Sequence, residues 1–161
     1  MAIKTYKTHG LTVTYKDDVD GVLRALKSAT FRGLKAIGET AETYAKEEIS
    51  KAKQHADGSI RDAIDTGNLR NKIASKVVGR SETKQEVYIG TNVKYAPYVE
   101  FGTGKYTTGK SRAKKIPWVY KDGKGKWHTT SGQMPHPYLK PAAENHTDEY
   151  KNILKESLQN A

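Results

Sequence analysis

A run of mostly apolar residues, spaced three or four positions apart, occupies much of the first third of the chain. Its members are Val19, Leu23, Leu26, Thr30, Leu34, Ile37, Ala41, Tyr44, Glu48 and Ala52, with Ile49 beside Glu48. This spacing puts one face of an α-helix against a core, and the basic residues of the run lie mostly off that face. Asp17, Asp18 and Asp20 stand at its start, where acidic side chains cap a helix and favour its positive end. The sequence therefore predicts a long amphipathic helix over residues 19–52.

Two glycines interrupt this predicted helix. Gly33 and Gly38 each cost about 1 kcal/mol relative to alanine in a helix interior. Their presence predicts a bend or a close backbone approach at these positions, and a neighbouring subunit is one candidate for what approaches.

The other segments predict short strands and a second helix. Residues 11–15 alternate as a strand, residues 73–79 and 85–90 predict one hairpin, and residues 116–120 and 126–130 predict another. Trp118 and Trp127 are expected to meet across the second hairpin. Residues 60–64 favour a helical turn, and Pro141 opens a C-terminal helix with a buried face. That face comprises Leu139, Ala143, His146, Tyr150, Ile153, Leu154 and Leu158. The expected fold class is α+β: a small antiparallel sheet packed with the long and C-terminal helices.

Residues 87–104 (VYIGTNVKYAPYVEFGTG) concentrate aromatic side chains in one short turn of helix. Tyr95, Tyr98 and Phe101 lie within seven positions, and Pro97 fits the first helical turn. We interpret this turn as a plug on the sheet, a subunit contact, or both. Glu100 among these aromatics needs a cation, and Arg70 is the predicted partner.

Three stretches, read together, carry a family resemblance: residues 65–70 (DTGNLR), residues 89–104, and residues 137–142 (PYLKPA). Their order and spacing resemble those of the small tail-component, or head–tail joining, proteins of long-tailed bacteriophages. The middle stretch is the most specific. Tyr138 and Lys140 depart from the Phe and Arg that this family usually shows. The resemblance implies a structural protein of the neck or upper tail that forms or completes a ring.

The composition sets further limits. The chain has 161 residues, only 35% of them apolar, and no cysteine. We expect a single domain over residues 1–161, a thin core and stabilisation by assembly. The N-terminus lacks the apolar core of a signal peptide, and no apolar run is long enough to span a membrane.

Most of the net charge of +10 lies in one segment, residues 105–126, within a predicted basic excursion over about residues 105–134. Its cations are Lys105, Lys110, Arg112, Lys114, Lys115, Lys121, Lys124 and Lys126, against Asp122 alone. Such a patch fits an anionic partner, either nucleic acid or an acidic protein surface, and it also fits a solvated loop.

No pattern in the sequence indicates catalysis. The five histidines are scattered without metal-ligand spacing, and His136, between two prolines, is expected at the surface. No nucleophile elbow or complete phosphate loop is present, so we expect no enzymatic activity, cofactor or metal.

Two functions of different classes remain. The first is a structural virion protein, located in the neck or tail and in the host cytoplasm during assembly. Its partners would be copies of itself in a ring and other phage neck and tail proteins. The second is a small basic nucleic-acid-binding module, in which Trp118, Tyr120 and Trp127 supply stacking surfaces. The two can coincide, because DNA passes through a neck ring.

Overall fold

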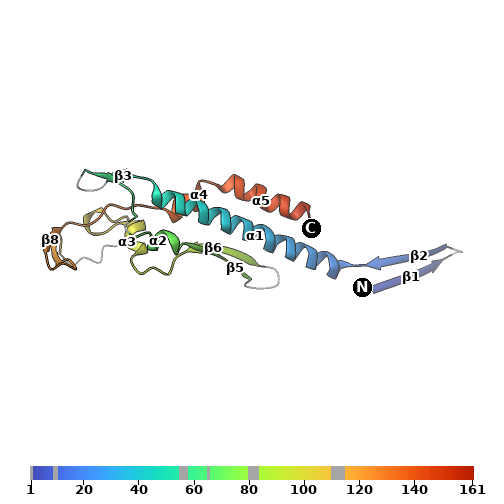
Figure 1. Ribbon diagram of the computed structural model, residues 1–161. Coiled ribbons are helices and arrows are strands. Elements are labelled where there is room, and N and C mark those ends of the chain that lie inside the picture. The colour runs from blue at the N-terminus through green and yellow to red at the C-terminus, as the bar shows by residue number, and fades with distance from the viewer. Residues whose placement is uncertain (1, 9–10, 55–57, 65, 80–83, 110–114) are drawn as a thin grey trace.

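The computed structural model describes residues 2–8, 11–54, 58–64, 66–79, 84–109 and 115–161 (Figure 1). Its elements, in chain order, are β1 (Ala2–Thr8), β2 (Leu11–Asp17), α1 (Val19–Ser50), β3 (Lys53–Gln54), β4 (Ile60–Arg61), α2 (Asn68–Asn71), β5 (Ala74–Gly79), β6 (Gln85–Gly90), α3 (Ala96–Phe101), the 3₁₀ helix η1 (Gly104–Tyr106), β7 (Trp118–Lys121), β8 (Trp127–Thr130), α4 (Leu139–Glu144) and α5 (Thr147–Gln159).

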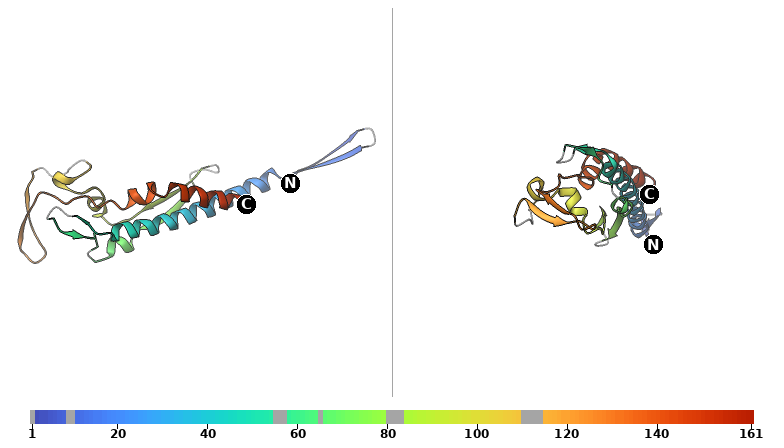
Figure 2. Two further views of the ribbon diagram at one scale, coloured as in Figure 1. Left: turned by 90° about the horizontal axis from the view of Figure 1, so that it is seen from above. Right: turned by 60° about the vertical axis from the view of Figure 1, so that its left-hand side comes forward.

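The long helix α1 is the axis of the molecule. Helix α5 runs antiparallel along one side of it, and the β5–β6 hairpin lies along another side (Figures 1 and 2). The β1–β2 hairpin extends from the N-terminal end of α1, away from the other elements (Figure 1). The predicted α+β class and the predicted long helix are therefore confirmed.

In the described residues, the strands form four antiparallel hairpins: β1–β2, β3–β4, β5–β6 and β7–β8. The predicted hairpins over residues 73–90 and 116–130 are confirmed. The prediction of a helical turn at residues 60–64 is wrong, because Ile60 pairs with Gln54 in a two-residue ladder. Strand β1 was not predicted from the sequence; it pairs with β2 along its whole length.

The glycines of α1 meet other elements of the same chain. A Cβ at Gly38 would lie 2.9 Å from Val87 Cγ2 of β6, and one at Gly33 would lie 2.9 Å from Leu154 Cδ1 of α5. The close approach at Gly33 and Gly38 is thus confirmed, but the described contacts are made by α5 and the β5–β6 hairpin rather than by a neighbouring subunit.

Polar contacts also join α1 to α5 and to the β5–β6 hairpin. Tyr44 donates to Glu149 Oε2 of α5 at 2.6 Å, which, as the main cause, raises the pKa of Tyr44 to about 12. His146 stacks on the Tyr44 ring with centroids 3.4 Å apart. On the other side, the Ser75 amide donates to Glu42 Oε2 at 3.1 Å. These contacts fix how α5 and β5 lie along α1.

The start of α1 and the C-terminal helix differ from expectation in detail. Asp18 occupies the N-cap position but makes no side-chain capping hydrogen bond within the described residues. The C-terminal helix is broken between α4 and α5, at Asn145 and His146. Of the predicted buried face, Ala143 and Leu158 are exposed and no residue of α5 is fully buried, whereas Ala142, outside that face, is buried.

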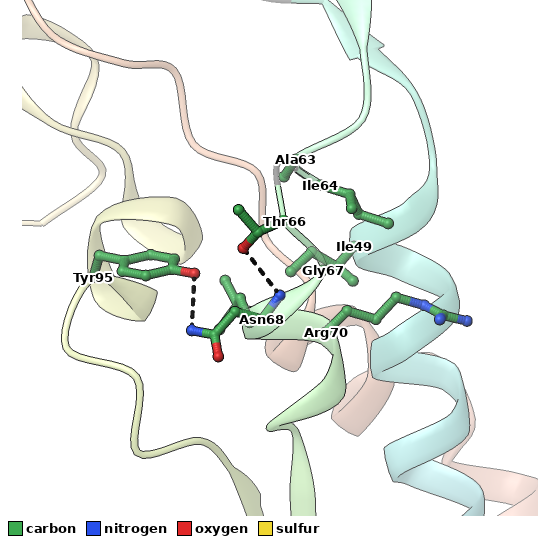
Figure 3. Close-up of a pocket in the computed structure, with 9 residues that line it drawn as sticks. Ile49, Ala63, Ile64, Thr66, Gly67, Asn68, Arg70 and Tyr95 are labelled. Atoms are coloured by element: carbon green, nitrogen blue, oxygen red, sulfur yellow. Dashed lines mark hydrogen bonds between the residues drawn. The ribbon is translucent and has the colours of Figure 1, made fainter. Parts of the chain in front are cut away.

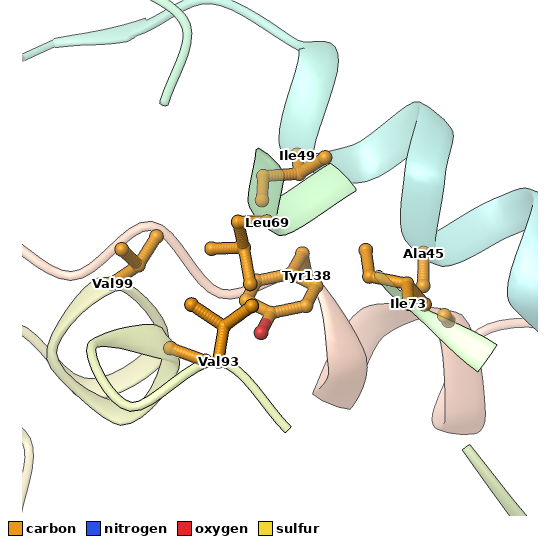
Figure 4. Packing of buried hydrophobic residues seen from close by; sticks show 9 residues of the cluster. Ala45, Ile49, Leu69, Ile73, Val93, Val99 and Tyr138 are labelled. Atoms are coloured by element: carbon orange, nitrogen blue, oxygen red, sulfur yellow. The ribbon is translucent and has the colours of Figure 1, made fainter. Parts of the chain in front are cut away.

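The core is small and lies at the C-terminal end of α1. Ala45 and Ile49 of α1 pack against a group of residues from three later segments (Figure 4). That group is Leu69, Ile73, Val93, Ala96, Val99, Tyr138 and Ala142. No helix in the described ranges is both long and apolar enough to cross a membrane.

Candidate interaction site

The stretches at residues 66–70, 89–104 and 137–142 converge in space. Leu69 comes from the first, Val99 from the second and Tyr138 from the third, and all three pack in the same core (Figure 4). Asp65, the first residue of the predicted DTGNLR turn, lies outside the described residues. These stretches therefore form one structural unit, with α3 at its surface.

The Glu100 carboxylate joins α3 to α4. It is buried, and it accepts backbone N–H groups from Tyr138 at 2.8 Å, Leu139 at 3.0 Å and Lys140 at 3.1 Å. The first turn of a helix leaves such N–H groups without intrahelical partners, and a carboxylate satisfies them well. The predicted pairing of Glu100 with Arg70 is wrong, since no ion pair joins these two described residues and Arg70 is exposed. Backbone donors replace the expected cation.

The loop after α3 is locked to residues 131–136 by main-chain hydrogen bonds. The Thr103 amide donates to Gln133 O at 2.8 Å, and the Lys105 amide donates to Ser131 O at 3.0 Å. The His136 amide donates to Val99 O at 2.7 Å. His136 is 2% exposed, so the prediction of a surface histidine is wrong. Its neighbouring prolines hold it in the packed segment of residues 131–136.

Helix α3 and its N-cap residue Tyr95 have a core-facing side and an outer side, and the aromatic residues lie on the outer side. Ala96, Val99 and Glu100 are buried, whereas Tyr95, Tyr98 and Phe101 are 44%, 48% and 52% exposed. Large side chains held half-exposed on a rigid turn are typical of protein–protein contacts. The turn is thus packed on one side and leaves an aromatic surface on the other.

A hollow of about 470 Å³ borders α3 at Tyr95 (Figure 3). Its apolar lining residues are Ile49, Ala63, Ile64 and Leu69. Its polar lining residues are Thr66, Asn68, Arg70 and Tyr95. The Asn68 side-chain amide donates to the Tyr95 hydroxyl at 3.4 Å. The structure therefore brings Arg70 and Tyr95, two predicted site residues, to the same hollow.

A second hollow of about 640 Å³, here called the α3–α4 groove, lies on the other part of α3. It contains the other two predicted residues that border a hollow, Glu100 and Phe101. Its lining is mainly apolar, and Lys94, Lys140 and Glu144 are its charged exposed members. Sequence reasoning missed this groove because β6 and α3 form one part of its wall and α4, about forty positions further along the chain, forms the other.

Tyr138 lies under this groove with a polar atom that finds no partner. Its side chain is fully buried, and its hydroxyl has no hydrogen-bond partner within the described residues. Burial, with a smaller contribution from the Glu100 carboxylate, raises the pKa of Tyr138 to about 12. An unsatisfied buried hydroxyl costs about 1–3 kcal/mol.

We therefore expect Tyr138→Phe to raise the free energy of unfolding by about 1 kcal/mol, measured by urea denaturation. The matched control is Tyr44→Phe, which removes a hydroxyl that does have a partner and should lower stability. A loss of stability in Tyr138→Phe as large as in Tyr44→Phe would show that the Tyr138 hydroxyl is satisfied.

The basic segment is described only in part. Lys110, Arg112 and Lys114 lie outside the described residues, whereas Lys105, Lys115, Lys121, Lys124 and Lys126 are exposed. The Lys105 ammonium lies 4.9 Å from the centroid of the Tyr106 ring, and that of Lys121 lies 5.7 Å from the centroid of the Trp127 ring.

The β7–β8 ribbon does not pair its two tryptophans. Trp118 is opposite Thr130, and Trp127 is opposite Lys121. Because side chains alternate along a strand, Trp118 and Tyr120 share one face and Trp127 lies on the other. The predicted cross-strand pair is wrong. The expected stacking residues Trp118, Tyr120 and Trp127 likewise do not form one continuous surface.

The turn of this ribbon is held by Asp122. Its Oδ1 accepts the amides of Lys124 and Lys126 at 2.9 Å each, and its Oδ2 lies 2.8 Å from His128 Nε2. The hydrogen bond with His128 is the largest cause that lowers the pKa of Asp122. Within the described residues, no group of three His, Cys, Asp or Glu side chains is placed to hold a metal ion. The arrangement is that of a packed, basic, partly aromatic surface.

The comparison with known proteins agrees with this assembly of α1, the β5–β6 hairpin and α3. Residues 16–102 match the family model described as "Bacteriophage HK97-gp10, putative tail-component". The match covers more than half of the chain and ends at Gly102, just after α3. The chain belongs to this family of bacteriophage tail components. No curated protein and no solved structure matches it.

Proposed function

We propose that this chain is a structural virion protein of a phage or prophage neck or upper tail, where it forms or completes a ring at the head–tail junction. Its family membership supports a place in the tail. The ring and the junction are inferences from the resemblance of its three stretches and from the surface that they build. It acts by packing rather than by catalysis.

The observation that carries this proposal is the way α3 is held in place. Glu100 fixes the turn to α4 through three backbone hydrogen bonds, while Tyr98 and Phe101 stay about half exposed, with Phe101 on the wall of a largely apolar groove. A rigid aromatic surface of this kind suits docking, because little side-chain entropy is lost on binding. The proposed partners are further copies of the chain and other neck and tail proteins.

The experiment is removal of the gene from the phage or prophage, followed by electron microscopy of the lysate. We expect separate heads and tails, and joined particles on complementation with the wild-type chain. Complementation with Tyr98→Ala should be poorer, whereas Tyr88→Ala, which truncates a similarly exposed tyrosine on β6, should restore joining. Normal particles without the gene would contradict the proposal.

The basic segment supports a second candidate, a nucleic-acid-binding module. Its net charge of +7 over residues 105–126 suits contact with DNA in the channel or with an acidic protein surface. We favour the protein surface, because a channel that bound DNA through many lysines would slow the exit of the genome.

We therefore expect that changing Lys110, Arg112, Lys114 and Lys115 together to serine lowers attachment of tails to heads and leaves DNA affinity nearly unchanged. Gel-shift titration over a range of salt concentrations measures the DNA affinity. The charge-matched control changes four exposed lysines on the helices, Lys27, Lys35, Lys151 and Lys155. Loss of DNA binding with attachment intact would identify the nucleic acid as the partner.

A further inference from the structure

The N-terminal part of α1 presents apolar side chains that no described element covers. Val22, Leu23 and Leu26 are 57%, 58% and 43% exposed. Within the described residues, the hydrogen bonds that join α5 and β6 to α1 nearest its N-terminus are those from Ser157 Oγ to Ala29 O and from Gln85 Nε2 to Lys27 O. About two turns of α1 thus extend beyond α5 and the β5–β6 hairpin.

These residues continue the stripe that the rest of the chain does cover. Val22, Leu26, Ala29 and Gly33 follow one another at steps of four, three and four positions, so they lie on one face of α1. At Ala29 and Gly33 that face is buried, and Leu154 and Ser157 of α5 lie on it at Gly33. The exposed part is therefore an extension of an existing helix–helix interface.

The α3–α4 groove is mainly apolar, like this stripe, and two of its three exposed charged residues are cations. Ile89, Val93, Phe101 and Leu139 are among its apolar walls, and its exposed charged residues are Lys94, Lys140 and Glu144. The stripe begins beside Asp18 and Asp20, which are exposed acidic residues. An amphipathic helix that enters an apolar groove is a common recognition mode, and these opposite charges favour it.

The stripe and the groove lie at opposite ends of the molecule, as Figure 1 shows for the β1–β2 end of α1 and for α3. One copy therefore cannot fill its own groove with its own stripe. We propose that the first two turns of α1 dock into the α3–α4 groove of a second copy of this chain. This inference rests on the proposed function, because rings of identical subunits need such a heterologous, head-to-tail contact.

Disulfide cross-linking tests the contact, and the chain has no native cysteine to interfere. Leu23→Cys lies beside the stripe on the same exposed turns of α1, and Ala143→Cys marks the groove. Both positions are exposed, so the fold should persist, as circular dichroism checks. On oxidation in concentrated solution and in purified particles, we expect the double variant to give a ladder of dimers and larger species. Each single variant alone should remain monomeric, and an equimolar mixture of the two should stop at the dimer.

The control combines Ser28→Cys with Ala143→Cys. It moves the thiol on α1 from position 23 to the opposite side of the helix, so no ladder of cross-linked species should form. Self-linking of Leu23→Cys alone would mean a symmetric contact between stripes, and a link from Leu23→Cys to another virion protein would mean a different occupant. Either result, or no link in solution and particles, would overturn the proposed contact. Particles that contain the chain without this link would leave the proposed function standing, whereas particles that lack the chain would overturn that function itself.

Discussion

Replacing Glu100 by alanine is expected to lower the free energy of unfolding by about 3 kcal/mol or more. The carboxylate accepts three backbone N–H groups at the start of α4, and its side chain is buried. Alanine would leave these donors without partners, the Tyr138 amide among them in a fully buried residue. Chemical denaturation followed by circular dichroism measures the loss.

Two comparisons separate this effect from a general loss of charge. Glu100→Gln keeps the shape of the side chain and one acceptor oxygen, but its amide NH₂ group would face a backbone N–H donor. We therefore expect a loss of stability that is smaller than for Glu100→Ala. Glu47→Ala removes an exposed carboxylate from α1 and should change stability by less than about 0.5 kcal/mol. If Glu100→Ala were as stable as Glu47→Ala, the link between α3 and α4 would not support the fold.

The second large effect is expected from Gly104→Ala, with a loss of about 3 kcal/mol in the free energy of unfolding. Gly104 has a φ of 61°, and a Cβ there would lie 2.1 Å from the Ser131 carbonyl oxygen. Because that atom belongs to the backbone, the contact cannot be relieved by rotating a side chain. The hydrogen bond from the Lys105 amide to Ser131 O would have to break.

Gly90→Ala is the matched control for this substitution. Gly90 belongs to the same family stretch but has no positive φ and no heavy atom within 4 Å of a built Cβ. Thermal unfolding should therefore show little change for Gly90→Ala and a clear decrease for Gly104→Ala. Equal melting temperatures would mean that the loop after α3 adjusts freely.

The elements with strong local patterns were predictable from the sequence. The three- and four-residue spacing along α1 specifies a helix without knowledge of its neighbours, and alternation with turn residues specifies the β5–β6 and β7–β8 hairpins. The α3 turn was predictable from Pro97 and its flanking glycines. These features depend on residues close together in the chain.

Features that depend on distant residues were not predictable. Nothing near Glu100 in sequence shows that its partners are the amides of Tyr138, Leu139 and Lys140. The register of the β7–β8 strand pair decides whether Trp127 faces Trp118, because a shift of one position along a strand moves a side chain to the other face. The burial of His136 likewise depends on the hydrogen bonds that join residues 131–136 to α3 and to the loop after it.

The structure places four of the predicted site residues at two hollows: Arg70 and Tyr95 border one, and Glu100 and Phe101 border the other. The role of these residues and of Tyr98 at a subunit contact stays a prediction, and so does the role of the basic segment. The separation of α3 into a buried and an exposed side follows only from the packing of α4.

The most direct test of the account is the number of copies of this chain in purified particles. Quantitative mass spectrometry against an isotope-labelled standard, with a capsid or tail-tube protein as internal reference, gives that number. The proposal predicts several identical copies per particle, located by cryo-electron microscopy as a closed ring between head and tail. A single copy per particle, or none, would contradict it.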